Sequence, residues 1–135
     1  MQNEHQLIDD LYQTTSEFIS DLASIFTYET EKGDMDLIEF FYKRLHKDRV
    51  MSHTRDKLLP WKSYIDARDI EFFNENRYIF GGLPEDRISY YTDLIVSKKR
   101  LSDDDLDACW AYLDTMIACA ESYERHVDAN RQHGR

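Results

Sequence analysis

Glycine and proline are scarce in this chain, with four Gly and two Pro among 135 residues. Collagen-like and low-complexity chains contain far more of both residues, so these classes are excluded. No apolar run approaches the roughly 20 residues that a membrane-spanning helix requires. The first ten residues, MQNEHQLIDD, lack the basic and apolar regions of a secretory signal peptide. We therefore expect a soluble protein that stays inside the cell and does not enter a membrane.

Cysteine is equally rare, and Cys109 and Cys119 stand ten positions apart. On a single helix that rises about 1.5 Å per residue, roughly 15 Å would separate them along the axis. A disulfide needs Cα atoms about 4.4–6.8 Å apart. We expect two free thiols that pack as small apolar groups in a reducing compartment.

Basic residues are outnumbered, because 17 Lys and Arg face 27 Asp and Glu for a net charge of −10. Domains that bind nucleic acid usually present a basic surface, so direct binding is not expected. Residues 1–42 contain ten acids and one base, whereas residues 43–57 contain six bases and two acids. This basic stretch, which includes Lys47 and Arg49, either pairs with the chain's own acidic helix or faces an anionic partner.

Apolar residues recur at intervals of three and four along most of the chain, which is the pattern of helices. Strand signals are weak, because β-branched and aromatic residues do not alternate between turns. One helical stripe runs through residues 3–28: Leu7, Leu11, Phe18, Leu22 and Ile25. Residues 14–16 are Thr, Thr and Ser and weaken its centre, so residues 1–30 form one acidic helix or a helix pair.

The next helix is predicted to follow Gly33, which stops the preceding one, and to be capped by Asp34. Large apolar side chains crowd into it. Burying one such side chain contributes about 1.5–3 kcal/mol, so they are predicted core residues. They are Leu37, Ile38, Phe40, Phe41, Tyr42 and Leu45.

Short helices are predicted in the middle of the chain. Pro60 suits the first position of one of them. Asp69 suits the N-cap of another, whose Phe72 and Phe73 enter the core. Further on, Gly81 and Gly82 predict a turn before a helix of residues 84–97. The basic residues 98–100 are expected to stabilise the carboxyl end of that helix rather than to bind an anion.

The last helix has the clearest signals. Ser102 and Asp105 form a variant capping box, and Leu101 and Leu106 have the spacing of a hydrophobic staple. An apolar stripe then repeats at intervals of four and three: Leu106, Trp110, Leu113, Ile117 and Ala120. Residues 129–135 are expected to fray. Residues 1–135 are thus predicted to form one all-α domain, an irregular bundle of about five or six helices around this stripe.

Motifs of known chemistry are missing from the sequence. It contains no phosphate-binding or dinucleotide-binding glycine loop, no HExxH, no GxSxG and no EF-hand loop. His46 and His53 are seven positions apart, two helical turns, which is too far for one metal ion. The neighbouring acids Asp103–Asp105 point about 100° apart on a helix and do not converge. We expect no catalytic residue, no metal site and no cofactor.

Several aromatic and charged residues are candidates for contacts with a partner. Trp61 and Tyr64 stand beside charged residues, a setting typical of protein interfaces, although ordinary filling of the core is the alternative. Lys47 and Arg49 belong to the basic stretch described above. These four residues are predicted partner contacts if they lie on the surface.

The second half of the chain contains a characteristic sequence pattern. An Ile, an Arg–Asp pair and two Phe precede a helix with Trp-x-Tyr-Leu and a later Tyr: Ile65, Arg68, Asp69, Phe72, Phe73, Trp110, Tyr112, Leu113 and Tyr123. In this order, residues 60–123 resemble small uncharacterised helical proteins encoded by large double-stranded DNA viruses of algae and amoebae. The resemblance implies a virus-encoded helical protein of the virion or of the infected cell's cytoplasm or nucleus. It carries no activity over to this chain.

The pair Arg68–Asp69 has two interpretations. It contacts a partner, or it is a structural clamp in which Asp69 caps its helix and Arg68 ties neighbouring helices together. The predicted partner contacts are therefore Lys47, Arg49, Trp61, Tyr64, Arg68 and Asp69.

The sequence is compatible with three functions. The first is a non-enzymatic module that binds a viral or host protein, with self-association left open, and it predicts an exposed apolar patch. The second is an acidic mimic of nucleic acid that binds a DNA- or RNA-handling protein through residues 1–42, and it predicts strong salt dependence. The third is an enzyme without a recognisable motif, which predicts a pocket with shifted pKa values.

Overall fold

The computed structural model describes residues 3–76 and 83–133, and within these ranges the chain forms helices and no strand. The prediction of an all-α fold is confirmed. Four longer helices make up the frame: α1 (Glu4–Ile25), α2 (Glu29–Arg44), α6 (Glu85–Val96) and α7 (Asp103–His133). Shorter segments connect α2 to α6: α3 (Lys47–His53), η1 (Thr54–Leu58, a π-helical turn), η2 (Leu59–Trp61, a 3-10 turn), α4 (Lys62–Asp66) and α5 (Glu71–Glu75).

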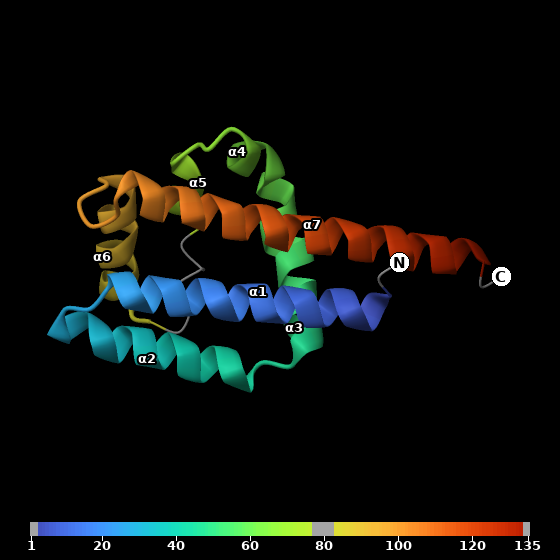
Figure 1. Cartoon of the computed structure of the whole chain (residues 1–135), viewed down its shortest axis with the longest axis horizontal. Helices are drawn as coiled ribbons and strands as arrows, with labels where there is room; N and C mark the ends of the chain where they lie inside the picture. Colours follow the sequence, from blue (N-terminus) through green and yellow to red (C-terminus); the bar gives the residue numbers. More distant parts are fainter. Residues whose placement is uncertain (1–2, 77–82, 134–135) are drawn as a thin grey trace.

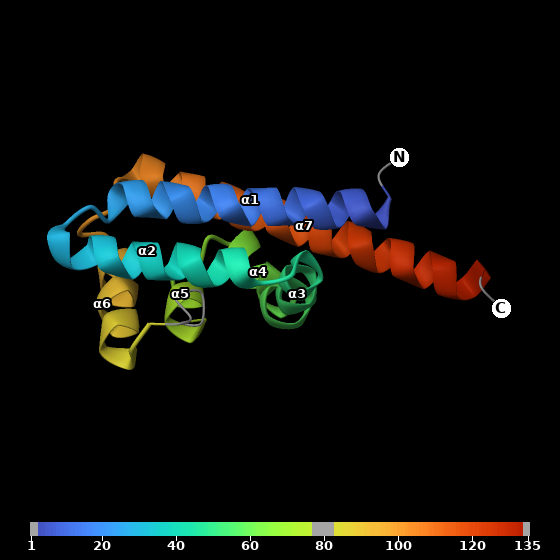
Figure 2. The same cartoon turned by 90° about the horizontal axis from the view of Figure 1, so that it is seen from below.

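Three of these longer helices, α1, α2 and α7, lie along the long axis of the molecule (Figure 1). Figures 1 and 2 show α1 packed between α7 and α2, with α6 across one end of the bundle. The segment from α3 to η1 crosses the other helices farther along, and α5 lies between α3 and α6. The core therefore forms where α1 and α7 meet the shorter connecting helices.

The predicted apolar stripe of α7 is at the centre of this core. Trp110, Leu113 and Ile117 are all buried. Phe72 and Phe73 of α5 pack against the indole of Trp110, with ring centroids 6.3 and 5.1 Å away. The capping box is confirmed as well, because Ser102 Oγ accepts a hydrogen bond from Asp105 N and Asp105 Oδ2 accepts one from Ser102 N, each 3.1 Å long.

Both cysteines are free thiols, as predicted from their spacing. Cys109 is buried and Cys119 is half-buried. Burial raises the pKa of the Cys109 thiol to about 12, so this thiol stays protonated and unreactive at neutral pH.

The predicted boundary at Gly33 is wrong. Gly33 lies inside α2, which begins at Glu29, and a Cβ at this position would meet nothing within 4 Å. The start of the helix is fixed instead by Glu31, whose carboxylate accepts a hydrogen bond of 3.0 Å from Tyr28 N. Asp34 caps nothing, because its side chain bonds to residues of α6. Residues 4–25 form one uninterrupted helix, α1. Thr15 does not break it, because its hydroxyl donates a hydrogen bond to the carbonyl of Leu11 within the helix.

The predicted core of α2 is also partly wrong. Ile38 and Tyr42 are buried, together with Met35 and Glu31, which share their face of the helix. Four other apolar side chains predicted to be buried lie in solvent: Leu37 (37% exposed), Phe40 (50%), Phe41 (45%) and Leu45 (49%). A helix presents only one face to its core, and successive residues turn by about 100°, so this crowded run cannot be buried as a whole.

Two further predictions concern the ends of helices. α6 ends at Val96 and the basic residues 98–100 follow it closely, with Lys98 at a left-handed φ of 58°, but Arg100 pairs with Glu31 rather than with the end of α6. α7 continues through residues 129–133, contrary to the predicted fraying, and Asn130 donates a 2.7 Å hydrogen bond to Glu4. The predicted turn at Gly81–Gly82 lies outside the described residues.

Candidate interaction surface

The pair Arg68–Asp69 makes the intramolecular contacts of a clamp. Arg68 donates hydrogen bonds of 2.8 and 2.7 Å to the two carboxylate oxygens of Asp114 on α7, and another of 3.1 Å to the carbonyl of Ile65. Asp69 accepts a hydrogen bond of 3.0 Å from Glu71 N at the start of α5. The Arg68 bonds therefore tie the turn between α4 and α5 to α7, although both side chains of the pair stay exposed.

The predicted aromatic contacts lie on the short helices beside this clamp. Trp61 is half-buried, and Tyr64 is 39% exposed. Their rings meet edge to face with centroids 4.8 Å apart. Tyr64 therefore offers one isolated aromatic side chain to solvent rather than a patch.

The basic stretch divides into paired and unpaired cations. Lys47 forms a 3.0 Å ion pair with Asp9 of α1, and Arg55 forms a 3.3 Å pair with Glu124 of α7. Exposed Arg49 makes no ion pair with any described residue, and the same holds for Lys43 and Arg44 at the end of α2. One part of the stretch therefore holds helices together, and the other part faces solvent.

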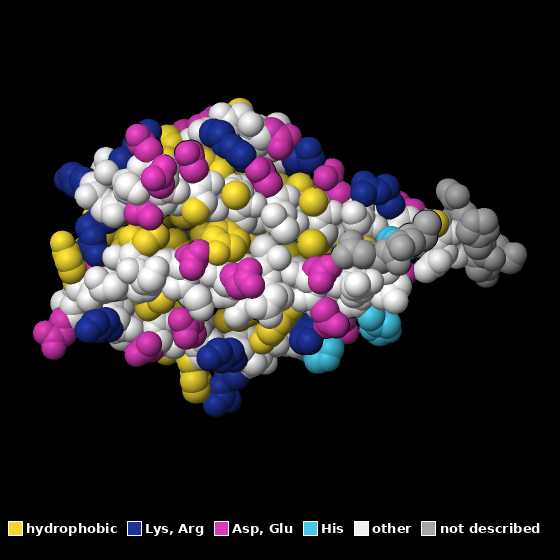
Figure 3. Space-filling model, viewed as in Figure 1, with side chains coloured by type: hydrophobic (Ala, Val, Ile, Leu, Met, Phe, Trp, Pro, Cys, Tyr) yellow, Lys and Arg dark blue, Asp and Glu magenta, His cyan; other side chains and the backbone are white. Residues whose placement is uncertain are grey.

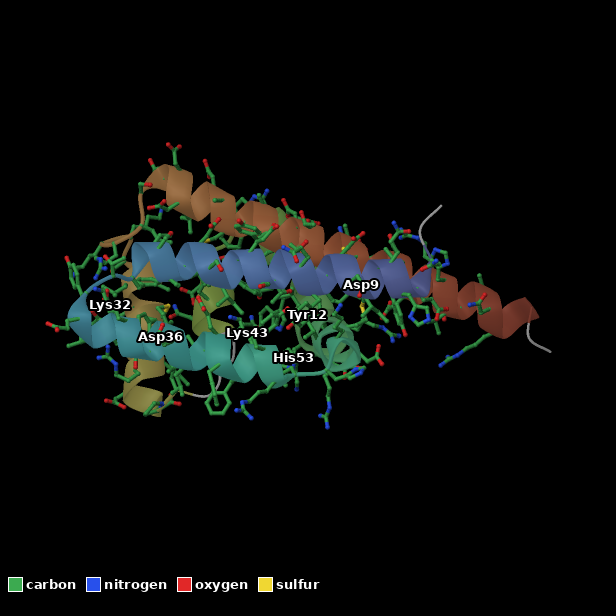
Figure 4. All side chains as sticks on the ribbon, turned by 60° about the horizontal axis from the view of Figure 1, so that its bottom comes forward. Asp9, Tyr12, Lys32, Asp36, Lys43 and His53 are labelled. Atoms are coloured by element: carbon green, nitrogen blue, oxygen red, sulfur yellow. The ribbon has the colours of Figure 1, made fainter. Side chains whose placement is uncertain are left out.

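The largest exposed apolar side chains gather on α2. Six of them are more than a third exposed within the described residues, and five belong to α2 and its two cap residues. We call four of these the α2 stripe: Leu37, Phe40, Phe41 and Leu45. Leu37, Phe41 and Leu45 follow at intervals of four and so lie on one side of the helix. Lys32, Asp36 and Lys43 form a charged row along α2, which Figure 4 labels.

An apolar groove of about 350 Å³ adjoins the α2 stripe. α1 and α7 supply its floor, with Phe18 and Leu22 from the first helix and Leu113 from the second. α2 supplies one wall through Phe41 and Leu45, which also belong to the stripe. α3 and η1 supply a further wall through Val50, His53, Thr54 and Leu58. The exposed stripe and the groove are therefore one continuous surface.

Polar groups in the wall of the groove are already bonded within the protein. Thr15 donates to the carbonyl of Leu11, Thr54 to the carbonyl of Val50, and Tyr42 to the carbonyl of Tyr12, at 2.9, 2.8 and 2.7 Å. Burial, with the neighbouring Tyr12 also contributing, raises the pKa of the Tyr42 phenol against the opposing effect of its hydrogen bond with Thr15. The interior of the groove therefore offers contact to apolar groups.

The charges at the groove are all basic or neutral. No Asp or Glu of residues 3–76 and 83–133 lines it, and the nitrogen-bearing side chains that line it in these ranges are Arg44 and His53. The Arg44 guanidinium lies 4.1 Å from the ring centroid of Phe40, so it covers one edge of the stripe. Burial and the nearby charge of Lys57 lower the pKa of His53, with Asp56 opposing them, so His53 is neutral at pH 7.

Other hollows of the molecule contain carboxylates. One of about 480 Å³ lies beside the Arg68–Asp114 pair, and one of about 250 Å³ lies between α1 and α7 at Asp21 and Asp105. Figure 3 shows acidic side chains along both of these helices, with apolar side chains between them. The apolar groove at α2 thus differs in charge from the rest of this acidic surface.

The sequence did not reveal a polar network at the opposite end of α2. Glu31 has no exposed surface and accepts hydrogen bonds from Arg100 (2.7 and 2.8 Å) and Tyr90 (2.5 Å). Asp34, one turn on, accepts bonds of 2.8 Å from Arg87 and 2.6 Å from Tyr91. One signal was available, because Glu31 lies on the same face of α2 as the buried residues 35, 38 and 42.

This network is built for stability. Burial opposes ionisation of Glu31, but its bonds with Arg100, Tyr90 and the backbone of Tyr28 outweigh burial and lower its pKa. The carboxylates of Glu31 and Asp34 are therefore held by cations and hydroxyls of the same chain. They are not available to an outside ligand.

The described residues contain no cluster of metal ligands. Within residues 3–76 and 83–133, no three His, Cys, Asp or Glu side chains are grouped in a way that could hold a metal ion. None of the helices in this part of the chain has the length and apolar character needed to cross a bilayer. Neither the protein-family models nor the curated proteins nor the solved structures contain a match to the chain.

Proposed function

We propose that this protein is a non-enzymatic interaction module that binds another protein through the α2 stripe and the adjoining groove. The concentration of exposed apolar side chains on one helix carries the proposal. Burying a Leu or Phe side chain contributes about 1.5–3 kcal/mol, so four left in solvent on one helix are costly unless a partner covers them. A groove next to an apolar ridge matches the way in which amphipathic helices are bound.

The chemistry of the groove supports binding rather than catalysis. A catalytic site needs a nucleophile or an acid–base pair within hydrogen-bond reach of each other. The hydroxyls in the wall are bonded to backbone carbonyls, and no carboxylate or thiol of the described residues lines the groove.

The nature of the partner follows from the sequence resemblance alone. Residues 60–123 resemble virus-encoded helical proteins, so we propose a viral or host protein as the partner, met in the virion or inside the infected cell. Self-association through the same stripe is the alternative. Light scattering separates the two, because a homodimer doubles the 16.2 kDa mass of the chain.

Affinity capture from extracts of the cells in which this protein is naturally made tests the proposal. The baits are the wild-type chain, the double variant Phe40→Ser/Phe41→Ser, and Tyr64→Ser as a control on another exposed ring. We expect the wild type and the Tyr64 variant to retain the same protein and the double variant to lose it. Retention of that protein by all three baits would contradict the proposal.

A second function is an acidic mimic of nucleic acid that acts through residues 1–42, and the acidic side chains along α1 in Figure 3 support it. Glu31 and Asp34 take no part in it, since they face inward. The salt dependence of capture separates the two functions. Binding through a mimic weakens steeply with salt, whereas binding through the α2 stripe persists.

A further inference from the structure

We infer that the groove at α2 takes the apolar face of an acidic amphipathic helix, with the carboxylates of that helix meeting the Arg44 guanidinium at its rim. The inference rests on the proposed function and adds the chemistry of the partner. It joins three observations: the size of the groove, the bonded state of its polar groups and the sign of the charge around it.

The size of the groove fits the side chains of a helix and not the helix itself. The groove has a volume of about 350 Å³, which is room for a few apolar side chains. A whole helix is about 10–12 Å wide and would not fit into it. The partner helix therefore lies on the rim, beside the ridge of Leu37, Phe41 and Leu45, and inserts a few apolar side chains.

The hydroxyls of the wall favour apolar groups because they are already bonded. Thr15, Tyr42 and Thr54 each donate to a backbone carbonyl. A polar side chain placed against these hydroxyls would lose its water without gaining a donor from them, which costs free energy. Leu, Ile, Met or Phe side chains of the partner are favoured for the same reason.

The rim selects the charge of the partner. Arg44 lines the groove and has no ion pair among the described residues, unlike Lys47 and Arg55 farther along the chain. The net charge of −10 favours basic partners at long range, but salt screens charges beyond about 8 Å at physiological ionic strength. At contact distance the Arg44 guanidinium decides, and it favours carboxylates.

A helical partner is favoured over an extended one. An extended peptide binds best by adding a strand to the edge of a sheet. The described part of the chain contains no strand and so no such edge. The spacing of Leu37, Phe41 and Leu45 instead gives a helical ridge against which a second helix packs.

Three synthetic peptides of about 18 residues, or five helical turns, test the inference. All carry Leu and Phe anchors. The first has Glu at every flanking position, the second has Lys there, and the third keeps Glu but permutes the anchors so that they no longer share a face. Fluorescence anisotropy at about 0.15 M salt measures the dissociation constant of each labelled peptide.

We expect the Glu-flanked peptide to bind about tenfold more tightly than the other two, since only it matches both the apolar wall and the basic rim. Phe41→Asp should weaken its binding about tenfold, because a carboxylate then faces apolar side chains. Arg44→Glu should weaken it about threefold and tighten binding of the Lys-flanked peptide. Arg131→Glu, at an exposed position near the end of α7, is the matched control and should change neither.

Each alternative result overturns the inference in a different way. Equal or tighter binding of the Lys-flanked peptide would reject the acidic partner and leave the interaction module standing. Binding of dodecanoate that Phe41→Asp abolishes, with no peptide bound, would assign the groove to a small amphiphile. Failure of all these probes, with a captured partner that still needs Phe40 and Phe41, would reject the helix but not the proposed function.

Discussion

Arg100 holds the buried carboxylate of Glu31 with two hydrogen bonds, of 2.7 and 2.8 Å. The same guanidinium lies 3.6 Å from the ring centroid of Tyr28 and donates to the carbonyl of Ile25. The segment before α7 is thereby fastened to the turn between α1 and α2. This contact fixes the amino end of α2 and so the direction in which its apolar stripe points.

Replacing either partner of the Glu31–Arg100 ion pair should destabilise the fold. Glu31→Gln or Arg100→Met leaves one group of a buried ion pair without its partner, which costs about 3–5 kcal/mol. Removing both partners together should cost less than the sum of the two single changes. Urea unfolding followed by circular dichroism measures these values. Asp36→Asn, on the exposed charged row of α2, is the control, and an equal loss there would contradict the assignment.

The stability of the protein should depend on pH through Glu31. Its folded pKa lies below the ordinary value of 4.5, so its contribution is fully present above that pH and is lost as pH falls through the folded pKa. The difference in free energy of unfolding between the wild type and Glu31→Gln should therefore shrink at pH values below 4.5. A difference that stays constant from pH 7 to acid would contradict this role.

Gly33→Ala should stabilise the protein. Gly33 is a helical residue with open space where a Cβ would stand, and alanine in a helix interior is better than glycine by about 0.5–1 kcal/mol. Thermal unfolding should show a higher midpoint for the variant. A lower midpoint would mean that this position needs the conformational freedom of glycine.

Trp110→Ala should cost about 3–5 kcal/mol, because the indole is buried against Phe72 and Phe73 and its removal leaves a cavity. Tyr64→Ala removes a ring of similar size from the surface and should cost much less. Denaturant unfolding of the two variants compares them directly. Equal costs would contradict the placement of Trp110 at the centre of the core.

Local signals in the sequence predicted α7 well. The capping box of Ser102 and Asp105 involves residues three positions apart, and the stripe through Trp110 repeats without interruption. Such features involve residues close together in the sequence, so they can be predicted from the sequence alone. α2 was harder, because apolar residues occupy several of its faces and only packing decides which face is buried.

Long-range contacts explain what the sequence did not predict. Arg100 is 69 residues from Glu31, and Asp114 is 46 residues from Arg68, so neither pair has a local pattern. The groove likewise collects side chains from α1, α2, α3, η1 and α7. The predicted contacts Lys47 and Arg68 turned out to be bonded within the fold, whereas the exposed rings of Phe40 and Phe41 had been assigned to the core.

The free energy of unfolding of Phe40→Ser/Phe41→Ser tests the central claim most directly. If these rings serve binding, the double variant keeps the stability of the wild type within about 1 kcal/mol, as surface substitutions do. If they belong to the core, its stability falls by about 3–5 kcal/mol or more. The first result is the one that the exposed α2 stripe predicts, and the second would contradict the account.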